Sequence, residues 1–312
     1  MIPVTLLNVE PHHAVLDMCA APGSKTIQIL EYLHANGDRM NTGFVVANDT
    51  DAKRAYMLAH QAKRLNLPAL YVTNNDARRF PNLKQGPEKK NFQFDRILCD
   101  VPCSGDGTLR KNTGLWKNFH CHMGHQNHRL QLDILKRGLA LLKKDGRLVY
   151  STCSFNPIEN EAVVQAVLTQ MKGQVELVDV SGEVSQELKY RPGMTAWKVF
   201  HRGKGKNWPP LWYKTWESVE DWKRDDMDAQ TGQSKSHALS STMFHEIYTH
   251  LNHENETKAD PLGLQKCMRL FPHDDNQGGF FVAVFKKLVD QPSGIIHDSG
   301  MSMNAWDNPN VR

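Results

Sequence analysis

Short apolar runs alternate with longer segments of helical periodicity over the first 180 residues of the chain. The apolar runs are almost continuous, which is typical of strands buried on both faces of a sheet. Strands are therefore predicted at residues 14–19, 43–49, 70–76, 94–102, 147–153 and 175–180. Helices are predicted from Ser24 to about Asn36, over residues 51–66, over residues 126–146 with Gly146 as the stop, and from Asn156 and Pro157 onward. This alternation predicts a mostly parallel sheet with helices on both faces.

The pattern changes after residue 180. Residues 181–275 are polar with weak periodicity, and we expect an irregular insertion there. The segment GGFFVAVFKK at residues 278–287 is again a strong strand pattern, and its long separation from the other strands predicts an antiparallel partner. The predicted organisation is a core at residues 1–180, the insertion at 181–275, a final core strand within 276–289 and a polar tail at 290–312.

Reactive and acidic residues gather at the ends of the predicted strands. In parallel sheets, ligands bind beyond the carboxyl ends of the strands. The residues at or just after these ends are Asp17 to Lys25, Asp49, Asp76, Asp100 to Cys103, and Cys153. Because independent strand ends point to the same edge of the sheet, we expect one ligand site there.

Composition limits the class of protein. The chain has 312 residues, of which 40% are hydrophobic and 23% are charged, as in ordinary globular proteins. No window approaches the uninterrupted apolar length that a membrane span needs. Six cysteines in a chain of this length do not make a disulfide scaffold, so we expect a reducing compartment in which a thiol can be reactive. The net charge of +4 permits a polyanionic partner without requiring one.

The segment DMCAAPGSKT at residues 17–26 joins a strand, a turn of small residues and the start of a helix. Small residues let backbone N–H groups approach a ligand, and a helix N-terminus favours negative charge. The glycine spacings of a P-loop and of GxGxxG are both absent. Asp49 suits a ribose hydroxyl and Asp76 an adenine amino group, so the set predicts a nucleoside-bearing cofactor without bound pyrophosphate. Taken singly, each aspartate is equally well a turn residue or a helix cap.

The segment DVPC at residues 100–103 lies where many nucleic-acid amino-methyltransferases carry an Asp/Asn-Pro-Pro-aromatic loop. Cys103 takes the place of the aromatic residue, which favours methylation of carbon over nitrogen. A thiolate that adds to carbon 6 of a pyrimidine makes carbon 5 nucleophilic, and a carboxyl group at the base edge, for which Asp100 is the candidate, stabilises the adduct. One such cysteine alone would be a packed structural residue, but Cys153 follows a neighbouring strand. The residues leave open which cysteine attacks.

Several motifs together resemble a known family. They are DMCAAPGSKT, the aspartate of VVANDTD, NNDA, ILCDVPCSGDGTLRK, YSTCSFNPIENEAVV and the late segment GGFFVAVF. From Met1 to about Lys287 the chain is similar to the RNA cytosine-5 methyltransferases of the Nol1/Nop2/Sun family, most of all to its eukaryotic tRNA-modifying branch. The resemblance implies a Rossmann-like class I methyltransferase fold with a mostly parallel seven-stranded sheet. It also implies S-adenosylmethionine as the cofactor of the core at residues 1–180.

Roles for individual residues are implied by the same resemblance. Cys153 is implied as the nucleophile, and Cys103 as the residue that assists breakdown of the covalent adduct. Asp100 is implied to hold the base and to shape the cofactor pocket. The implied cofactor-binding residues are Cys19, Ala20, Ala21, Pro22, Gly23, Ser24, Lys25, Asp49, Asp76 and Asp100.

The activity expected from the resemblance is methylation of carbon 5 of cytosine in tRNA through a cysteine–carbon 6 adduct. We expect a monomer with no metal and no membrane, in the nucleus or nucleolus, with the cytoplasm as the alternative. Members of this branch carry a substantial upstream segment that helps bind RNA, whereas this chain begins almost at its first strand. The alternative function is therefore a truncated, catalytically idle RNA-binding module.

Two further segments have candidate chemistry. HCHMGHQNH at residues 120–128 offers metal ligands, but side chains so close in sequence rarely converge without a partner cluster, so we expect a polar loop that enters a helix. HRGKGKNWPPLWYKTW at residues 201–216 mixes cations with aromatics, which suits a single-stranded RNA surface or a loop anchored by its tryptophans. Arg110 and Lys111 are the expected phosphate contacts, because they follow the DVPC loop.

Overall fold

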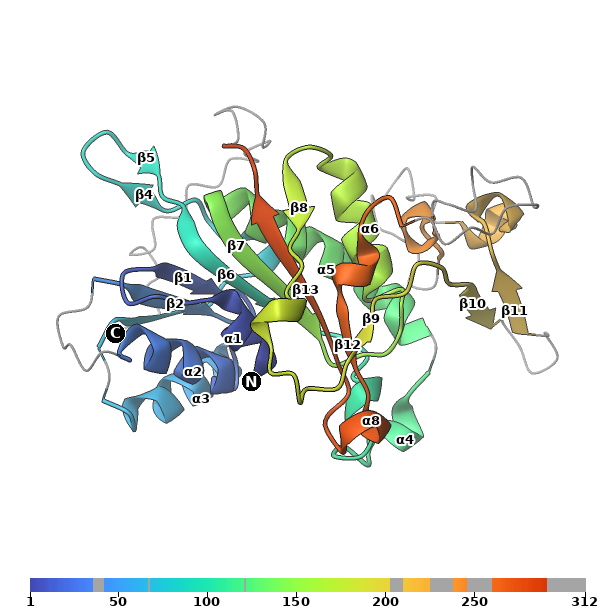
Figure 1. Cartoon of the computed structure of the whole chain (residues 1–312), viewed down its shortest axis with the longest axis horizontal. Helices are drawn as coiled ribbons and strands as arrows, with labels where there is room; N and C mark the ends of the chain where they lie inside the picture. The colour runs from blue at the N-terminus through green and yellow to red at the C-terminus, as the bar shows by residue number, and fades with distance from the viewer. Residues whose placement is uncertain are drawn as a thin grey trace.

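The near-continuous apolar runs form the parallel half of one large sheet. The computed structural model describes residues 1–35, 42–66, 68–120, 122–202, 210–224, 238–245 and 260–290. The parallel strands are β1 (Ala14–Asp17), β2 (Phe44–Asn48), β3 (Leu70–Thr73), β6 (Phe94–Asp100) and β7 (Leu142–Thr152). Their order in the sheet is β3-β2-β1-β6-β7, so the carboxyl ends of β1, β6 and β7 are neighbours (Figure 1).

The late apolar strand closes the sheet in the opposite direction. As predicted, β13 (Phe280–Lys287) is antiparallel, and it pairs with β7 along most of its length. Three short strands extend the sheet beyond it: β8 (Val175–Leu177) and β12 (Met268–Leu270) both pair with β13, and β9 (Arg191–Pro192) pairs with β12. The predicted fold class is confirmed, but in the described part of the chain the sheet has nine strands instead of seven. The two extra strands, β9 and β12, come from the segment in which no sheet strand was predicted.

Helices cover both faces of this sheet, as the alternation predicted. On one face lie α1 (Ile2–Leu7), α2 (Ser24–Leu33) and α3 (Ala52–Lys63), and on the other lie α5 (His122–Leu141) and α6 (Glu161–Gln170) (Figure 1). Successive strand residues point to opposite faces. Val15 of β1 therefore packs into the cluster of α1 and α2, and Leu16 packs into the cluster of α5 and α6.

The remaining described elements are short. They are the helices α4 (Leu115–Asn118) and α8 (Pro272–Asp275), the hairpins β4 (Lys84–Gln85) with β5 (Lys90–Asn91) and β10 (Val199–Arg202) with β11 (Pro210–Tyr213), and the 3-10 turns Ala77–Arg79, Asp106–Thr108, Ser181–Glu183, Trp216–Ser218, Asp221–Lys223, Ser241–Met243 and Leu264–Lys266. The predicted polar tail lies outside the described residues, apart from Asp290. In the part of the chain that is described, no helix has the length and apolar character to cross a membrane.

Two of the predicted helix boundaries differ most from the structure, by five residues each. The helix expected to stop at Gly146 ends at Leu141, and the chain enters β7 directly at Leu142. Leu142 is fully buried and pairs with Phe94, and the register with β6 shifts before Arg147, so the intervening residues bulge outward around Asp145 at φ 59°.

The second wrong boundary is the helix predicted to open at Asn156. Asn156 does accept a hydrogen bond from the Ile158 amide, as a cap would, but α6 begins only at Glu161. Glu159, the expected acid of the first turn, is fully buried and directed at other partners.

Candidate active site

The loop after β1 is shaped by backbone hydrogen bonds to the neighbouring strand ends. The amide of Ala20 donates to the Asn48 carbonyl at 2.8 Å, and the amide of Ala21 donates to Asp49 Oδ2 at 3.1 Å. Gly23 has φ 111°, and a Cβ there would lie 3.3 Å from Leu58 Cγ, so the position requires glycine. The small residues Cys19 to Gly23, with Ser24 and Lys25 called the cradle below, therefore pack closely against the carboxyl ends of β1 and β2.

Asp49 and Asp76 differ in how accessible their carboxylates are to a ligand. Asp49 is buried, and its carboxylate accepts from the amides of Ala21 and Asp51, which makes it a support of the loop. Asp76 follows β3, and both of its oxygens accept from the Arg78 guanidinium. The hydrogen bonds from Arg78 lower the pKa of Asp76, although burial opposes them. Both acids lie at the predicted edge.

Asp17 is a buried acceptor beneath the same loop. Its Oδ2 atom accepts from Thr26 Oγ1 at 2.7 Å, whereas Oδ1 has no hydrogen-bond partner of normal geometry among the described residues. Burial raises the pKa of Asp17 to about 7. A buried polar atom without a partner is costly unless a bound molecule or water supplies the donor. An acceptor here fits a cofactor that brings a hydrogen-bond donor into the loop.

Asp100 joins the ends of three elements. Lys25 Nζ of α2 lies 2.5 Å from Asp100 Oδ2, and Ser151 Oγ of β7 donates to Asp100 Oδ1 at 2.8 Å. Lys25 also lies 5.3 Å above the ring of Phe280. The Asp100 side chain is 25% exposed, so it is accessible while its orientation is fixed.

The two predicted reactive thiols meet at this edge. Cys103 Sγ and Cys153 Sγ are 3.2 Å apart, although 50 residues separate them in sequence. The hydrogen bond from Cys103 lowers the pKa of Cys153, and Lys25 contributes to the lowering against burial and the charge of Asp100. The same hydrogen bond, burial and the negative charges of Cys153 and Glu159 raise the pKa of Cys103. Cys153 is therefore the thiol favoured as a thiolate, with Cys103 as its hydrogen-bond donor.

Backbone contacts join the loops that carry the two thiols. The Gly107 amide donates to the Cys153 carbonyl at 2.9 Å, and the Phe155 amide donates to Asp106 Oδ1 at 2.9 Å. A Cβ at Gly107 would lie 2.7 Å from the carbonyl oxygens of both Cys153 and Gly279. The close approach of the two loops depends on this glycine.

Sequence reasoning missed the polar residues that support the thiols. Ser104 and Ser154 follow Cys103 and Cys153, and their hydroxyl groups are 3.1 Å apart. Both hydroxyls donate to the buried carboxylate of Glu159. The acid was predicted only as a helix-start residue, because its position after Pro157 matches that pattern. The sequence feature that could have pointed to these supports is the serine that directly follows each of the two cysteines.

The histidine segment was predicted to be a polar loop that enters a helix, but from His122 onward it already forms the start of α5, and the side chains of His125 and His128 are buried there. His128 is fully buried on α5 and contacts the Ile158 carbonyl at 2.7 Å and Thr242 Oγ1 at 2.8 Å. The ring of His125 stacks on His201 with a centroid distance of 6.1 Å. Cys121 lies outside the described residues. Among the residues described, the group with three metal-ligand atoms within 4.8 Å of one another is elsewhere, at Glu10, His12 and His13.

The expected RNA contacts are only partly described. Residues 203–209 of the aromatic and basic segment lie outside the described residues. Trp212 is 63% exposed, whereas Trp216 packs against Phe244, so both predicted interpretations apply to parts of the segment. The Arg110 guanidinium donates to Asn276 Oδ1 at 2.7 Å, while Lys111 is exposed.

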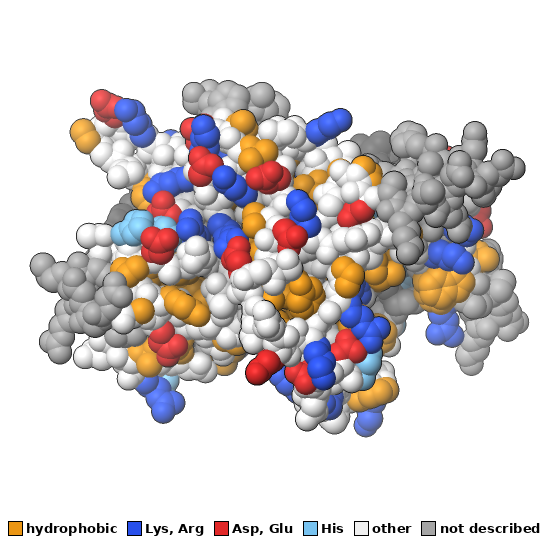
Figure 2. Space-filling model, viewed as in Figure 1, with side chains coloured by type: hydrophobic (Ala, Val, Ile, Leu, Met, Phe, Trp, Pro, Cys, Tyr) orange, Lys and Arg blue, Asp and Glu red, His pale blue; other side chains and the backbone are white. Residues whose placement is uncertain are grey.

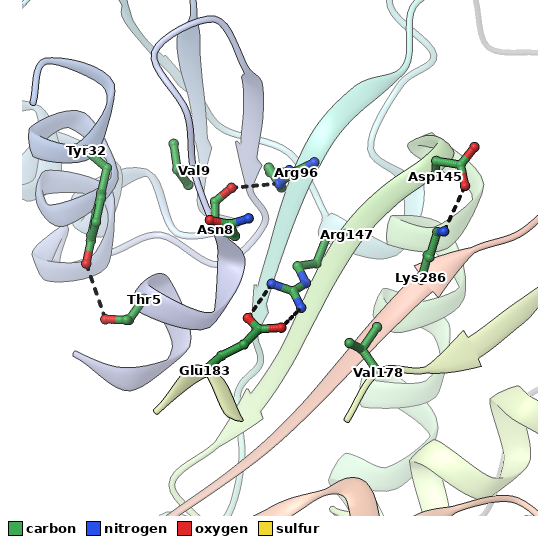
Figure 3. Close-up of a pocket in the computed structure, with 10 residues that line it drawn as sticks. All are labelled: Thr5, Asn8, Val9, Tyr32, Arg96, Asp145, Arg147, Val178, Glu183 and Lys286. Atoms are coloured by element: carbon green, nitrogen blue, oxygen red, sulfur yellow. Dashed lines mark hydrogen bonds and ion pairs between the residues drawn. The ribbon is translucent and has the colours of Figure 1, made fainter. Parts of the chain in front are cut away.

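A separate cavity of about 590 Å³ lies toward the other ends of β6 and β7. Basic and acidic side chains are interspersed on the face of the molecule that Figure 2 shows. In the cavity, Arg147 lies 2.5 Å from Glu183 and Lys286 lies 3.0 Å from Asp145 (Figure 3). Arg96 donates to the Asn8 carbonyl. These cations are occupied by protein partners, and the cavity contains neither thiol.

Comparison with known proteins gives consistent matches. The family described as "16S rRNA methyltransferase RsmB/F" matches residues 4–207. The multisite-specific tRNA:(cytosine-C(5))-methyltransferase of Saccharomyces cerevisiae is 45% identical over 93% of this chain and 38% of its own length. The tRNA (cytosine(34)-C(5))-methyltransferase of Drosophila melanogaster is 46% identical over 92% of this chain and 36% of its own length. The chain thus spans less than half the length of these relatives.

Solved structures show the same fold. The crystal structure described as NSun6 from Pyrococcus horikoshii with SFG has a TM-score of 0.59 at 21% identity, and the match covers 93% of this chain and 51% of that chain. A second structure from Pyrococcus horikoshii, described as a methyltransferase homologue protein, has a TM-score of 0.54 at 24% identity over 92% of this chain and 65% of that chain. At these identities the likeness establishes the architecture.

Proposed function

Because the chain belongs to the 16S rRNA methyltransferase RsmB/F family, we propose that it transfers a methyl group from S-adenosylmethionine to carbon 5 of a cytosine in tRNA. The observation that carries the proposal is the pair of thiols 3.2 Å apart beside Asp100 at the carboxyl edge of the sheet. Both similar eukaryotic proteins are named as tRNA cytosine-C(5)-methyltransferases, which supports the choice of base, atom and RNA.

The proposed cofactor site is the loop after β1 and the strand ends around it. S-adenosylmethionine, when bound, supplies an electrophilic methyl group. The cradle residues from Cys19 to Lys25 approach it through their backbone, while Asp49 holds the cradle through the Ala21 amide. Asp17 offers a buried acceptor, and Asp76 offers a carboxylate that is 35% exposed. Asp100 lies between this loop and the thiols and contacts Lys25.

In the proposed reaction Cys153 is the nucleophile. Its thiolate would add to carbon 6 of cytosine, and carbon 5 of the resulting enamine would attack the methyl group, whose bond to the cofactor sulfur breaks so that a neutral thioether leaves. Asp100 holds the ring-nitrogen and amino edge of the base, where charge changes during the addition. The proton on carbon 5 then leaves to a base, the S–C6 bond breaks, and its electron pair returns to Cys153. Cys103 assists this elimination from its position beside Cys153.

The order of the two cysteines is supported by their surroundings. The hydrogen bond between the thiols is the largest cause of both shifts: it lowers the pKa of Cys153, where Lys25 adds to the lowering, and raises the pKa of Cys103, where Glu159 adds to the raising. A nucleophile must be deprotonated, and a group that serves in the later step must first remain a thiol. The target cytosine must also leave its stack to bring carbon 6 to a thiol that is partly buried at the ends of the strands.

Sequencing of methylated tRNA tests the proposal. Incubation of the chain with tRNA and S-adenosylmethionine, followed by bisulfite sequencing, is expected to reveal new protected cytosines. Mass spectrometry of the nucleosides is expected to place the methyl group on carbon 5. A methyl group on nitrogen would refute the thiol mechanism. A folded sample that does not bind S-adenosylmethionine in a calorimetric titration would favour the idle RNA-binding module instead.

A further inference from the structure

Glu159 holds the two cysteine loops together from behind the reactive centre. We propose that Glu159 is the positioning residue of the methyl transfer, and that its carboxylate sets the distance between the thiols by binding the residue that follows each of them. This role rests on the function proposed above. It is distinct from the roles of Cys103, Cys153 and Asp100, because the Glu159 carboxylate contacts neither thiol directly in the hydrogen bonds observed.

The Glu159 carboxylate is fully buried and saturated with donors. Its side chain accepts five hydrogen bonds, and the residue has no exposed surface. Burial of a carboxylate is expensive unless hydrogen bonds replace its hydration. The five donors therefore hold the Glu159 carboxylate in one position, and the carboxylate in turn restricts the positions of the donors.

The donors on one side come from both cysteine loops. The Ser104 amide donates to Glu159 Oε1 at 2.8 Å, and the Ser104 hydroxyl donates to Oε2. The Ser154 hydroxyl donates to Oε2 at 2.8 Å. Since Ser104 follows Cys103 and Ser154 follows Cys153, one carboxylate binds both loops at the residue next to a thiol.

The donors on the other side come from the helix behind the site. Asn127 and Gln131 of α5 donate to Glu159 Oε1 at 3.1 Å and 3.0 Å. They are four residues apart and therefore lie on one face of the helix. Gln131 also donates to the Pro102 carbonyl, which precedes Cys103, at 2.9 Å. These hydrogen bonds attach the Glu159 carboxylate to α5. The helix therefore fixes the position of the loops that carry the thiols.

A neighbouring buried acid offers a matched control. Glu161 is also fully buried, but its carboxylate pairs with Arg269, whose Nε lies 2.6 Å from Glu161 Oε1. It contacts the Met194 amide and neither serine. Arg269 also donates to the Phe155 carbonyl, but loss of Glu161 leaves Ser104 and Ser154 bound to Glu159, so it should weaken the fold while the thiols stay close together.

The first test measures how readily the two thiols meet, without RNA or cofactor. Diamide oxidises a pair of close thiols to a disulfide and takes up their two hydrogens to become a hydrazine. The rate at which Cys103 and Cys153 cross-link would be followed by mass spectrometry in the wild-type chain, in E159A, E159D, E159Q and E161A. Thermal melts would establish that each variant is folded.

The length and the acceptor atoms of residue 159 should decide the rate. We expect cross-linking to be slower by about tenfold in E159A and E159D, since a displacement of about 1 Å is enough to disrupt a reacting pair. E159Q keeps the length and an acceptor for the Ser104 amide, so it should recover most of the rate. E161A should melt at a lower temperature and cross-link like the wild type. Folded E159A or E159D that cross-links at the wild-type rate would overturn the proposal.

The second test asks whether the same positioning serves the reaction. We expect E159A to lower kcat for methyl transfer by about 100-fold while KM for S-adenosylmethionine changes little, and E159Q to restore part of kcat. An equal fall of kcat in E161A would indicate a merely structural role and contradict the proposal. If the wild-type chain transfers no methyl group, the proposed function fails, whereas the cross-linking comparison still decides the role of Glu159.

Discussion

At the scale of single residues, two identical side chains acquire different properties from their surroundings. Cys153 lies near the ammonium group of Lys25, whereas Cys103 lies near the buried carboxylate of Glu159. The hydrogen bond between the thiols is the main cause of this difference in pKa, Lys25 acts on Cys153 against the larger effect of Asp100, and Glu159 adds to the raised pKa of Cys103. In the proposed mechanism, Cys153 is the thiol that attacks and Cys103 is the thiol that remains protonated.

Asp100 is the residue on which base recognition depends in the proposed mechanism. We expect D100N to lower kcat by about 100-fold or more, because the amide cannot replace a carboxylate that is held by Lys25 and Ser151 at the base edge. The measurement is transfer of labelled methyl groups to tRNA under saturating substrate. Activity within a few-fold of the wild type would remove Asp100 from the mechanism.

Asp17 predicts a specific dependence of stability on pH. Its folded-state pKa of about 7 is above that of an unfolded aspartate, so the folded chain binds this proton more tightly. The contribution of Asp17 to stability is complete below about pH 4 and is lost as the pH rises to about 7, by about 1.4 kcal/mol per pH unit. D17N should therefore gain stability relative to the wild type over this range in urea unfolding. A difference between the two proteins that is independent of pH would contradict the assignment.

At the scale of elements, the loops after β6 and β7 act as one unit. They meet at Gly107, whose missing side chain allows contact with the Cys153 carbonyl. We expect G107A to destabilise the fold by roughly 1–3 kcal/mol and to reduce methyl transfer, because the new Cβ must push the loops apart. G182A is the control, since a Cβ there would meet nothing within 4 Å. Equal effects of the two substitutions on activity would argue against coupling of the loops.

The parallel strands could be predicted from the sequence, but their supports could not. Buried strands are recognisable as apolar runs, and their carboxyl ends are known to meet, so the gathering of Asp100, Cys103 and Cys153 followed from the order of elements. The strand β12 and the role of Glu159 depend on contacts between distant segments. A local pattern such as Pro157 followed by Glu159 is typical of a helix start, and it does not reveal that the acid binds two serines. The alternation of strands and helices therefore predicted at which edge of the sheet the site lies. Only the tertiary structure shows which residues hold the site residues in place.

At the scale of the whole molecule, the surface offers no single field of positive charge on the face shown in Figure 2. If the proposed function holds, the exposed Lys111 is the better phosphate contact beside the DVPC loop, because Arg110 is engaged by Asn276.

This distribution of charge predicts a small but measurable salt effect. K111A should reduce the slope of log Kd for tRNA against log salt concentration by about 1, because one phosphate contact is lost. K53A, an exposed position on α3, serves as the control and should leave the slope unchanged. Identical slopes for K111A and the wild type would exclude Lys111 from the RNA contact.

The central claim is that Cys153 attacks and Cys103 releases, and a denaturing gel tests it most directly. Labelled tRNA would be incubated with S-adenosylmethionine and with the wild type, C103A, C153A or the double variant. We predict a stable protein–RNA band only for C103A, because the adduct forms through Cys153 and cannot be released. A trapped band for C153A, with none for C103A, would reverse the two roles and contradict the mechanism.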